Sequence, residues 1–268
     1  MRIVVCIKQV PATSDAKIDP ETKRIVREGS KAIVNPFDLY AIEEAVAIRE
    51  QAGGEVIALS MGPEKAKSAL VEALSMGADR AVLLSDRAFG GSDTWATSYV
   101  LAKAIETIGG VDLVICGKQA VDGDTAQVGA GIAAKLDILQ AANVWKVEEA
   151  ASDSITVKRM NERGWDRVKL TYPALLTVVK DINQPRVPTL RAALAARKAE
   201  IPIWKPEDIG AKPDRIGLAG SPTQVVKTAP PASRSAVTLK IDAAPAEAAK
   251  RLAAELLRRG LPKEVAQS

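Results

Sequence analysis

The 268-residue sequence contains no histidine, two cysteines and few aromatic residues. The commonest general base and metal ligand is therefore missing, and Ser-His-Asp or Cys-His catalysis is excluded. Cys6 and Cys116 are far apart and form no CxxC pair, which argues against a zinc or iron–sulfur site. We expect no metal site and no catalytic side chain, so any electron chemistry requires a bound organic cofactor.

Long apolar runs and a strong net charge are also missing. No segment reaches the ~18–20 apolar residues that a membrane-spanning helix needs, and residues 1–8 are charged too early for a signal peptide. The net charge is +4, without a basic stripe interleaved with aromatic residues, so we expect no nucleic-acid partner. Both cysteines lie in apolar runs, as reduced core residues do, and the expected compartment is the cytoplasm.

Hydrophobic residues make up 47% of the chain, enough for a substantial core. In the first half, Val- and Ile-rich runs typical of buried parallel strands alternate with segments of helical periodicity. Strands are expected at residues 2–7, 55–60, 81–85, 111–116 and 174–179. Helices are expected at residues 38–51, from Pro63, from Asp93 or Thr94 to about residue 108, and from about Thr125. This alternation predicts a doubly wound, mostly parallel α/β sheet.

The second half has a different character. Residues 154–160 and 165–170 flank a turn and predict a β-hairpin. From residue 183 the composition shifts to proline, arginine and lysine, which predicts an extended arm, with a short helix at 190–198, that packs on another chain. Residues 244–259 predict an amphipathic helix. The predicted organisation is a nucleotide-binding domain at residues 1–182, the arm at 183–232 and a helical tail at 233–268.

Three loops are expected where ligands bind in such sheets, beyond the carboxyl ends of the strands. Lys8 and the turn at residues 35–38 follow the first strand, Met61 and Gly62 follow the second, and residues 117–131 follow the fourth. Glycines allow close backbone approach, and the helices that follow offer free N–H groups to an anion. Residues 117–131 match neither GxGxxG nor GxxxxGK[ST], so an ordinary βα loop rich in caps remains an alternative to a phosphate loop.

Six motifs together resemble one known family. They are Cys-Ile-Lys-Gln-Val-Pro at 6–11, Asn-Pro-Phe-Asp at 35–38, Ser-Met-Gly-Pro at 60–63, Ala-Leu-Ser-Met-Gly-Ala-Asp-Arg at 73–80, Leu-Leu-Ser-Asp-Arg at 83–87 and Gly-Lys-Gln-Ala-Val-Asp-Gly-Asp-Thr-Ala-Gln-Val-Gly at 117–129. In this order they resemble the β subunit of electron-transfer flavoproteins, and the resemblance extends over residues 1–227.

The resemblance implies a Rossmann-like adenine-nucleotide-binding domain that pairs with an α subunit carrying FAD. In this family the β subunit holds AMP in plain electron carriers and a second FAD in electron-bifurcating members. The residues that match the family's cofactor-binding motifs are Cys6, Lys8, Asn35, Pro36, Phe37, Asp38, Met61, Gly62, Gly117, Lys118, Gln119, Ala120, Val121, Asp122, Gly123, Asp124, Thr125, Ala126, Gln127, Val128 and Gly129.

Residues 123–129 resemble the bifurcating, FAD-binding branch, and the small side chains of Gly123 and Ala126 leave room for a dinucleotide. Ala130 and the Leu39-Tyr40 pair are closer to plain carriers, so AMP remains the alternative cofactor. Bifurcation implies that NADH delivers a hydride to the β-subunit FAD. One electron then passes to ferredoxin or flavodoxin and the other through the α-subunit FAD.

Residues 183–198 resemble the family's partner-recognition loop, with Leu190 and Arg191 as contacts to an acyl-CoA dehydrogenase or a similar flavoenzyme. The alternative is that Leu190 begins a helix against its own domain. A function of another class is a universal-stress-type nucleotide-binding protein, but such proteins are shorter and lack the proline-rich arm. A small-molecule dehydrogenase requires GxGxxG and a substrate acid or base, and neither is evident.

Overall fold

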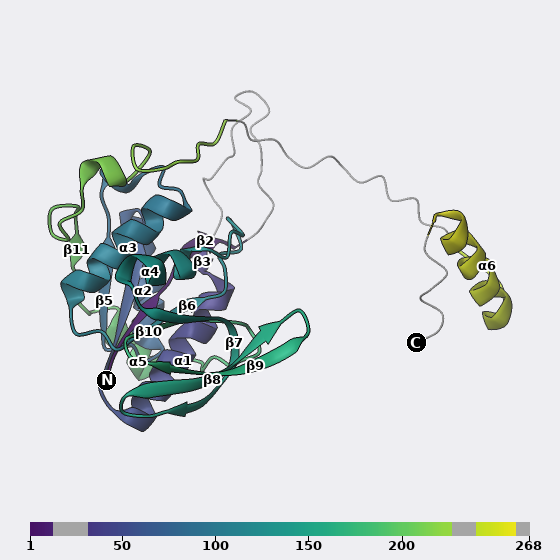
Figure 1. Ribbon diagram of the computed structural model, residues 1–268, viewed down its shortest axis with the longest axis horizontal. Coiled ribbons are helices and arrows are strands. Elements are labelled where there is room, and N and C mark those ends of the chain that lie inside the picture. Colours follow the sequence, from purple (N-terminus) through teal and green to yellow (C-terminus); the bar gives the residue numbers. More distant parts are fainter. Residues whose placement is uncertain (13–31, 227–239, 261–268) are drawn as a thin grey trace. The chain divides into compact units, whose positions relative to one another are not determined.

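The computed structural model describes residues 1–12, 32–226 and 240–260. The chain divides into two compact units, Met1–Val226 and Lys227–Ser268. The first is an α/β domain (Figure 1), and the described part of the second includes the helix α6 (Pro245–Arg258). Among the described residues, no helix is long and apolar enough to cross a membrane.

A nine-stranded sheet forms the centre of the first unit, in the order β11-β5-β4-β1-β6-β10-β7-β8-β9. From β11 to β7 neighbouring strands are parallel, and β8 and β9 are antiparallel additions. The strands are β1 (Arg2–Cys6), β4 (Glu55–Met61), β5 (Arg80–Leu84), β6 (Leu113–Gly117), β7 (Leu139–Ala150), β8 (Ser154–Asn161), β9 (Gly164–Thr171), β10 (Ala174–Val178) and β11 (Ile203–Trp204). The short strands β2 (Gln9–Pro11) and β3 (Ala32–Val34) pair separately. The predicted doubly wound, mostly parallel α/β fold is confirmed.

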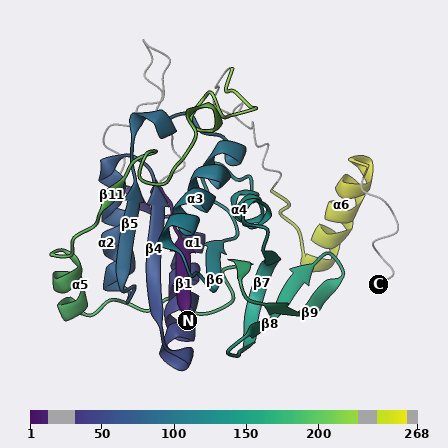
Figure 2. The same ribbon diagram turned by 60° about the vertical axis from the view of Figure 1, so that its left-hand side comes forward.

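Helices cover both faces of the parallel region (Figure 2). They are α1 (Pro36–Ala52), α2 (Lys67–Ser75), α3 (Thr94–Ile108), α4 (Val128–Leu136) and α5 (Leu190–Ala196), with 3-10 turns η1 (Glu64–Ala66), η2 (Arg87–Phe89) and η3 (Pro213–Arg215). Side chains alternate along each strand, so Ile3 and Val5 pack with α1 and α2, whereas Val4 and Cys6 pack with α3 and α4. Two apolar cores therefore lie on opposite faces of one sheet.

The strongest sequence signals correspond to observed elements. The predicted buried strands match β1, β4, β5, β6 and β10 to within two residues at either end. Asp93 caps α3 by accepting the N–H groups of Trp95 at 2.9 Å and Ala96 at 3.0 Å. Gly53, at a φ of 74°, ends α1 as expected from its conformational freedom. The hairpin at residues 154–170 is present as β8 and β9.

Two helix starts were predicted wrongly, and one strand was not predicted. Pro63 precedes the 3-10 turn η1, and the α-helix α2 begins only at Lys67. The helix expected from about Thr125 begins at Val128, because Asp124 and Ala126 adopt left-handed backbone angles that a helix cannot accommodate. Strand β7 was not expected, since its burial pattern is irregular and Asn143, at a φ of 58°, interrupts its alternation.

The arm beyond β10 packs extensively on its own domain, which was not predicted. Strand β11 pairs with β5, and α5 contacts α2. Ile209, Ala211 and Ile216 are buried in the core beneath α3. The Lys212 N–H also donates to the Tyr99 hydroxyl at 3.1 Å. The described arm is therefore part of the α/β unit, although parts of its surface remain apolar and exposed.

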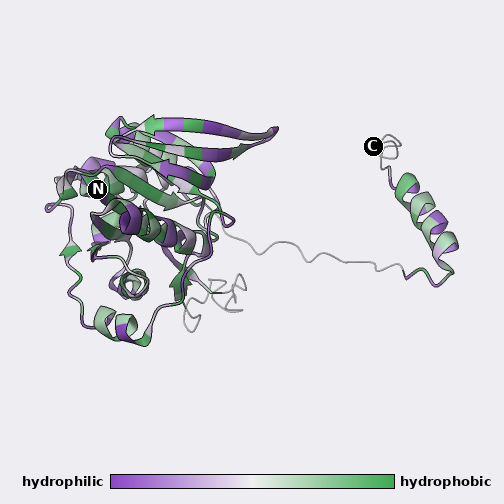
Figure 3. Cartoon of the chain, turned by 90° about the horizontal axis from the view of Figure 1, so that it is seen from below, coloured by the Kyte–Doolittle hydropathy of each residue, from purple (hydrophilic) through white to green (hydrophobic). Residues whose placement is uncertain are grey.

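The hairpin β8–β9 extends the sheet beyond its helix-covered region. Figure 3 shows hydrophobic and hydrophilic segments alternating along these strands. Ile155 and Val157 are buried, whereas Met160 and Trp165 near the turn are exposed. The Lys158 Nζ lies 4.3 Å from the centre of the Trp165 ring, a cation–π arrangement that covers part of this indole.

Candidate functional site

The loops singled out in the sequence meet where β1 and β6 end side by side. Cys6 is in register with Leu59 of β4 on one side and with Cys116 of β6 on the other. From β1 the chain continues to β4 on one side and returns later to β6 on the opposite side. In doubly wound sheets, ligands bind at the carboxyl edge where the strand order reverses in this way.

Asn35, immediately before α1, joins three segments at this edge. Its backbone N–H donates to the Lys8 carbonyl oxygen at 2.8 Å. Its Nδ2 donates to Asp38 Oδ1 and to the Gln119 carbonyl oxygen, both at 2.9 Å. Its Oδ1 accepts the Val121 N–H at 3.1 Å. Because Asn35 is buried and each of its side-chain polar atoms is hydrogen-bonded, it fixes the first part of the loop after β6 against α1.

Asp38, in the first turn of α1, is the buried carboxyl group of this edge. Its Oδ2 accepts the Lys8 N–H at 2.7 Å, and Asn35 and the Gly117 N–H also hydrogen-bond to it. Burial raises the pKa of Asp38 to about 7, although these hydrogen bonds and the charge of Lys8 lower it. Near neutral pH the carboxyl group therefore exchanges between its protonated and charged forms.

Gly117 allows β6 to approach α1 closely. A Cβ atom at this position would lie 2.3 Å from Asp38 Oδ1 and 2.8 Å from the backbone carbonyl carbon of Phe37. The next residue, Lys118, donates its N–H to the Val178 carbonyl oxygen of β10 at 2.8 Å. The start of the loop is thus fixed between α1 and β10, and any larger residue at position 117 would clash with the backbone.

Further along the loop the contacts become polar and exposed. The Lys8 Nζ pairs with both carboxylate oxygens of Asp122, at 2.7 and 2.9 Å. The Gln119 side-chain amide hydrogen-bonds to the Asp124 carboxylate. Residues 121–127 are all exposed, and a Cβ atom at Gly123 would meet no atom within 4 Å. The loop therefore has a fixed base and an open outer part.

The open part contains an unusual backbone. Asp124 and Ala126 have φ angles of 53° and 54°, a region that residues other than glycine rarely adopt. Helix α4 begins at Val128, and its N-cap, Gln127, makes no side-chain capping hydrogen bond. The N–H groups in the first turn of α4 are therefore not capped by that side chain and are suited to an anion.

The structure brings most of the predicted cofactor residues to this edge: Cys6, Lys8, residues 35–38 and residues 117–129. Met61 and Gly62 end the neighbouring strand β4, where the Gly62 N–H donates to the Leu84 carbonyl oxygen at 3.0 Å. Leu190 and Arg191 belong to α5, outside this cluster.

Thr177 and Val178 were missed, because the sequence predicts their strand but not its place beside β6. A Cβ atom at Gly129 would lie 2.5 Å from Thr177 Cγ2, so this glycine packs α4 against that strand.

The chemistry available here is that of binding. In the part of the chain that the structure describes, no group of three or more His, Cys, Asp or Glu side chains could hold a metal ion. Burial and the neighbouring thiol of Cys6 raise the pKa of the Cys116 thiol well above its usual value, so it is not a reactive thiolate. The buried Asp38 carboxyl group already accepts hydrogen bonds from the Lys8 N–H and the Asn35 side-chain amide.

Comparison with known proteins identifies the family. The electron transfer flavoprotein domain matches residues 22–209. The electron transfer flavoprotein subunit beta of Thermoanaerobacterium thermosaccharolyticum is 50% identical over 86% of this chain and 88% of its own length. The chain belongs to the electron transfer flavoprotein family, as a beta subunit.

Two other relatives of this beta subunit have different names. Protein FixA of Azorhizobium caulinodans is 45% identical over 97% of this chain and 95% of its own. The caffeyl-CoA reductase-Etf complex subunit CarD of Acetobacterium woodii is 48% identical over 87% of this chain and 89% of its own. The resemblance seen in the motifs is thus confirmed for the family and for electron transport by a flavoprotein beta subunit.

Proposed function

We propose that this beta subunit pairs with an electron transfer flavoprotein alpha subunit and that its carboxyl edge binds the adenine-nucleotide part of FAD. The observation that carries this proposal is the buried network in which Asn35 and Asp38 hold residues 117–121 at the switch point. The network leaves residues 121–127 exposed, and the N–H groups at the start of α4 have no side-chain cap from Gln127, so a phosphate group could bind there. The open space at Gly123 is compatible with a dinucleotide.

The proposed cofactor site consists of the residues predicted from the sequence: Cys6, Lys8, residues 35–38, Met61, Gly62 and residues 117–129. Their contribution is to bind and orient the cofactor. A bound FAD would supply hydride acceptance from NADH and transfer of single electrons. No acid or base from the protein is needed for that chemistry, which is consistent with the absence of histidine from the sequence.

We extend the proposal to flavin-based electron bifurcation, with NADH as donor and ferredoxin or flavodoxin as one acceptor. It is supported by the resemblance of residues 123–129 to the bifurcating branch and by the small, open positions in that loop. The name of CarD places that relative in a reductase complex acting on a CoA ester, which supports an acyl-CoA dehydrogenase or similar flavoenzyme as the partner of this chain.

The docking face for that partner is proposed to be the start of α5, with Leu190 and Arg191 as contacts. Leu190 is 77% exposed, so its side chain is available although α5 itself rests on α2. The division into a domain at 1–182, an arm at 183–232 and a tail at 233–268, and the cytoplasmic location, are parts of the same proposal.

The decisive experiment is to co-express the chain with its alpha subunit, release the bound cofactors and count FAD and AMP per heterodimer. Two FAD and no AMP, with bleaching of the flavin on addition of NADH, is the expected result. One FAD and one AMP would make the protein a plain electron carrier, and Ala130 and the Leu39-Tyr40 pair would then be the informative residues.

A paired substitution tests the position of the second nucleotide. Gly123→Phe places an aromatic ring in open space and should preserve folding while removing that nucleotide from the heterodimer. Glu162→Phe, in the exposed turn of the hairpin β8–β9, is the matched control and should keep the full cofactor content. Equal cofactor content in both variants would place the nucleotide away from residues 117–129.

A further inference from the structure

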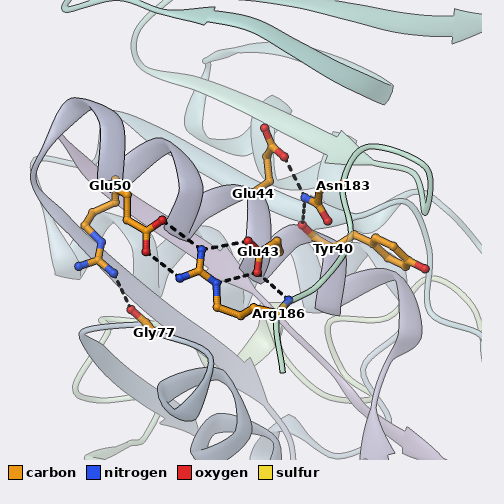
Figure 4. Close-up of polar contacts among 8 residues, drawn as sticks. Tyr40, Glu43, Glu44, Glu50, Gly77, Asn183 and Arg186 are labelled. Carbon is orange, nitrogen blue, oxygen red and sulfur yellow. Dashed lines mark hydrogen bonds and ion pairs between the residues drawn. The ribbon is translucent and has the colours of Figure 1, made fainter. Parts of the chain in front are cut away.

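The chain crosses the surface of α1 between β10 and α5, and two side chains hold it there (Figure 4). The Asn183 Nδ2 donates to the Tyr40 carbonyl oxygen at 3.0 Å and to Glu44 Oε2 at 2.9 Å. Arg186, three residues later, binds two other glutamates of the same helix. These contacts join residues about 140 positions apart in the sequence, so they fix the path of the arm across the domain.

Arg186 makes an unusually complete set of contacts. Its backbone N–H and Nε donate to Glu43 Oε2 at 2.9 and 2.8 Å, and its Nη2 donates to Glu43 Oε1 at 2.9 Å. Its Nη1 and Nη2 donate to the Glu50 carboxylate at 2.7 and 3.1 Å. Glu43 and Glu50 are seven residues apart, two helical turns, so they lie on one side of α1 and a single planar guanidinium can bridge them.

The burial of the partners gives this cluster its strength. The Glu43 side chain is 12% exposed and that of Arg186 34%, whereas the Glu50 side chain is 50% exposed. Both carboxylates raise the pKa of Arg186, and Arg186 lowers the pKa of Glu50. A lysine at this position could not reproduce the fork-like geometry, because its ammonium group is a point charge on a flexible stem.

Exposure changes abruptly beyond Arg186. Val187, the next residue, is 88% exposed, and Leu190 opens α5 at 77% exposure. Three residues separate the bridged arginine from Leu190. At the end of α5, by contrast, Ala196 is buried. The exposed side chains of Val187 and Leu190 therefore lie between two sets of contacts. The Arg186 cluster precedes them, and the packing of α5 on α2 follows them.

We propose that Arg186 is a positioning residue for partner docking: by bridging Glu43 and Glu50 it sets the direction in which Leu190 is presented to the partner flavoenzyme. This inference rests on the proposed function, in which Leu190 contacts that partner. Arg186 lies outside the proposed cofactor-binding residues, since the glutamates it binds lie beyond the first turn of α1.

The experiment uses the heterodimer with the alpha subunit, reduced with dithionite and mixed with increasing concentrations of an oxidised acyl-CoA dehydrogenase. The half-saturating dehydrogenase concentration and the limiting rate are measured for the wild type, Arg186→Lys, Arg186→Gln and Glu50→Gln. Reoxidation by ferricyanide, a small acceptor that needs no docking face, is measured in parallel. Arg163→Gln is the matched control, because Arg163 is an exposed arginine in the turn between β8 and β9, outside the recognition loop, and forms no ion pair within the described part of the chain.

We expect the half-saturating concentration to rise about fivefold for Arg186→Lys and more for Arg186→Gln, with an unchanged limiting rate. Glu50→Gln, which leaves the buried Glu43 pair intact, should give about a twofold rise. Ferricyanide rates and cofactor content should remain at wild-type values in all variants, and the Arg163→Gln control should dock like the wild type. If Arg186→Gln does not fold, Arg186→Lys and Glu50→Gln still test the positioning role of Arg186.

Leu190→Ala separates this inference from the proposal on which it rests. If Leu190→Ala weakens docking and Arg186→Lys does not, the positioning role is overturned and the docking face stands. If Leu190→Ala has no effect, both are overturned. A loss of cofactor and of ferricyanide activity in Arg186→Lys would assign the arginine a general structural role and overturn the inference as well.

Discussion

The carboxyl edge of β1 and β6 and the arm beyond β10 are both held against α1, but by different means. At the edge, Asn35 and Asp38 are buried and bind backbone groups of the neighbouring loops through short hydrogen bonds. On the arm, Arg186 binds carboxylates of the helix surface, and the residues that follow are exposed. One helix therefore supports a buried polar network at its start and a partly exposed ionic cluster along its side.

This difference suits the two proposed roles. A cofactor site requires a backbone that keeps its position, and buried hydrogen bonds are costly to leave unmade, so they specify one arrangement. A docking face must expose apolar side chains to a partner and can be held only from its flanks. The comparison can be tested by changing each region separately. The expected losses of stability are larger for the buried residues of the edge than for the exposed side chains.

The largest effect is expected at Gly117. In Gly117→Ala the new methyl group would lie 2.3 Å from Asp38 Oδ1 and 2.8 Å from the Phe37 backbone, so either β6 or α1 must shift. We expect a loss of about 3 kcal/mol in the free energy of unfolding, measured by urea denaturation of the full-length chain with tryptophan fluorescence. Gly123→Ala is the control, since its methyl group meets nothing within 4 Å, and it should change the stability by less than about 0.5 kcal/mol.

Asp38→Asn should follow, with a loss of about 1–3 kcal/mol. The carboxyl group accepts from the Lys8 N–H, Asn35 and the Gly117 N–H, and an amide would direct its own N–H groups at some of these donors. Asp86→Asn is a comparison at an exposed site, where a single backbone hydrogen bond to Ala88 is affected, and it should cost less. Equal losses in the two variants would show that burial adds nothing to the role of Asp38.

The same substitution should change the pH dependence of stability. Because the pKa of Asp38 is raised from 3.8 to about 7 in the folded state, the folded protein retains a proton that the unfolded chain releases. This contribution is fully present below about pH 4 and is lost as the pH rises to about 7. Stability measured between these pH values should therefore fall with rising pH more steeply in the wild type than in Asp38→Asn. Identical slopes would contradict the raised pKa.

At the arm, Leu190→Ala should leave the stability almost unchanged, because the side chain is 77% exposed. If Leu190 anchors the partner, its truncation should raise the half-saturating concentration of the acyl-CoA dehydrogenase about tenfold, equivalent to about 1.4 kcal/mol. Val225→Ala, equally apolar and 84% exposed, is the control and should have no effect on docking. A similar loss in both variants would indicate a diffuse apolar surface.

The central strands could be predicted because their Val- and Ile-rich runs are buried on both faces, a pattern typical of parallel strands covered by helices. Strand β7 could not, since its burial pattern is irregular and Asn143 adopts a left-handed conformation within it. The start of α4 was placed too early because Asp124 and Thr125 have the composition of a helix cap. The left-handed backbone of Asp124 and Ala126 is not visible in that composition.

Prediction of the candidate site from the sequence was limited in the same way. The rule for parallel sheets and the family motifs predicted that these loops meet at one edge, and the structure places them there. The contacts that hold them, Asn35 to Gln119 and to Val121, span 84 and 86 residues, and no local pattern announces such pairs. Arg186 was missed for the same reason: in the sequence it is one arginine in a basic segment, and its glutamates lie on a helix 143 residues earlier.

A small effect on stability is expected from the ion pair of Lys8 and Asp122, whose side chains are 46% and 33% exposed. Lys8→Gln and Asp122→Asn should each lower the free energy of unfolding by less than about 1 kcal/mol. The pair nevertheless sharpens the comparison, because Lys8 has two possible roles at the edge. If it only holds the loop, both variants should release the bound nucleotide equally. If it also contacts a phosphate group, Lys8→Gln should release more nucleotide than Asp122→Asn, and the difference should shrink as the salt concentration rises.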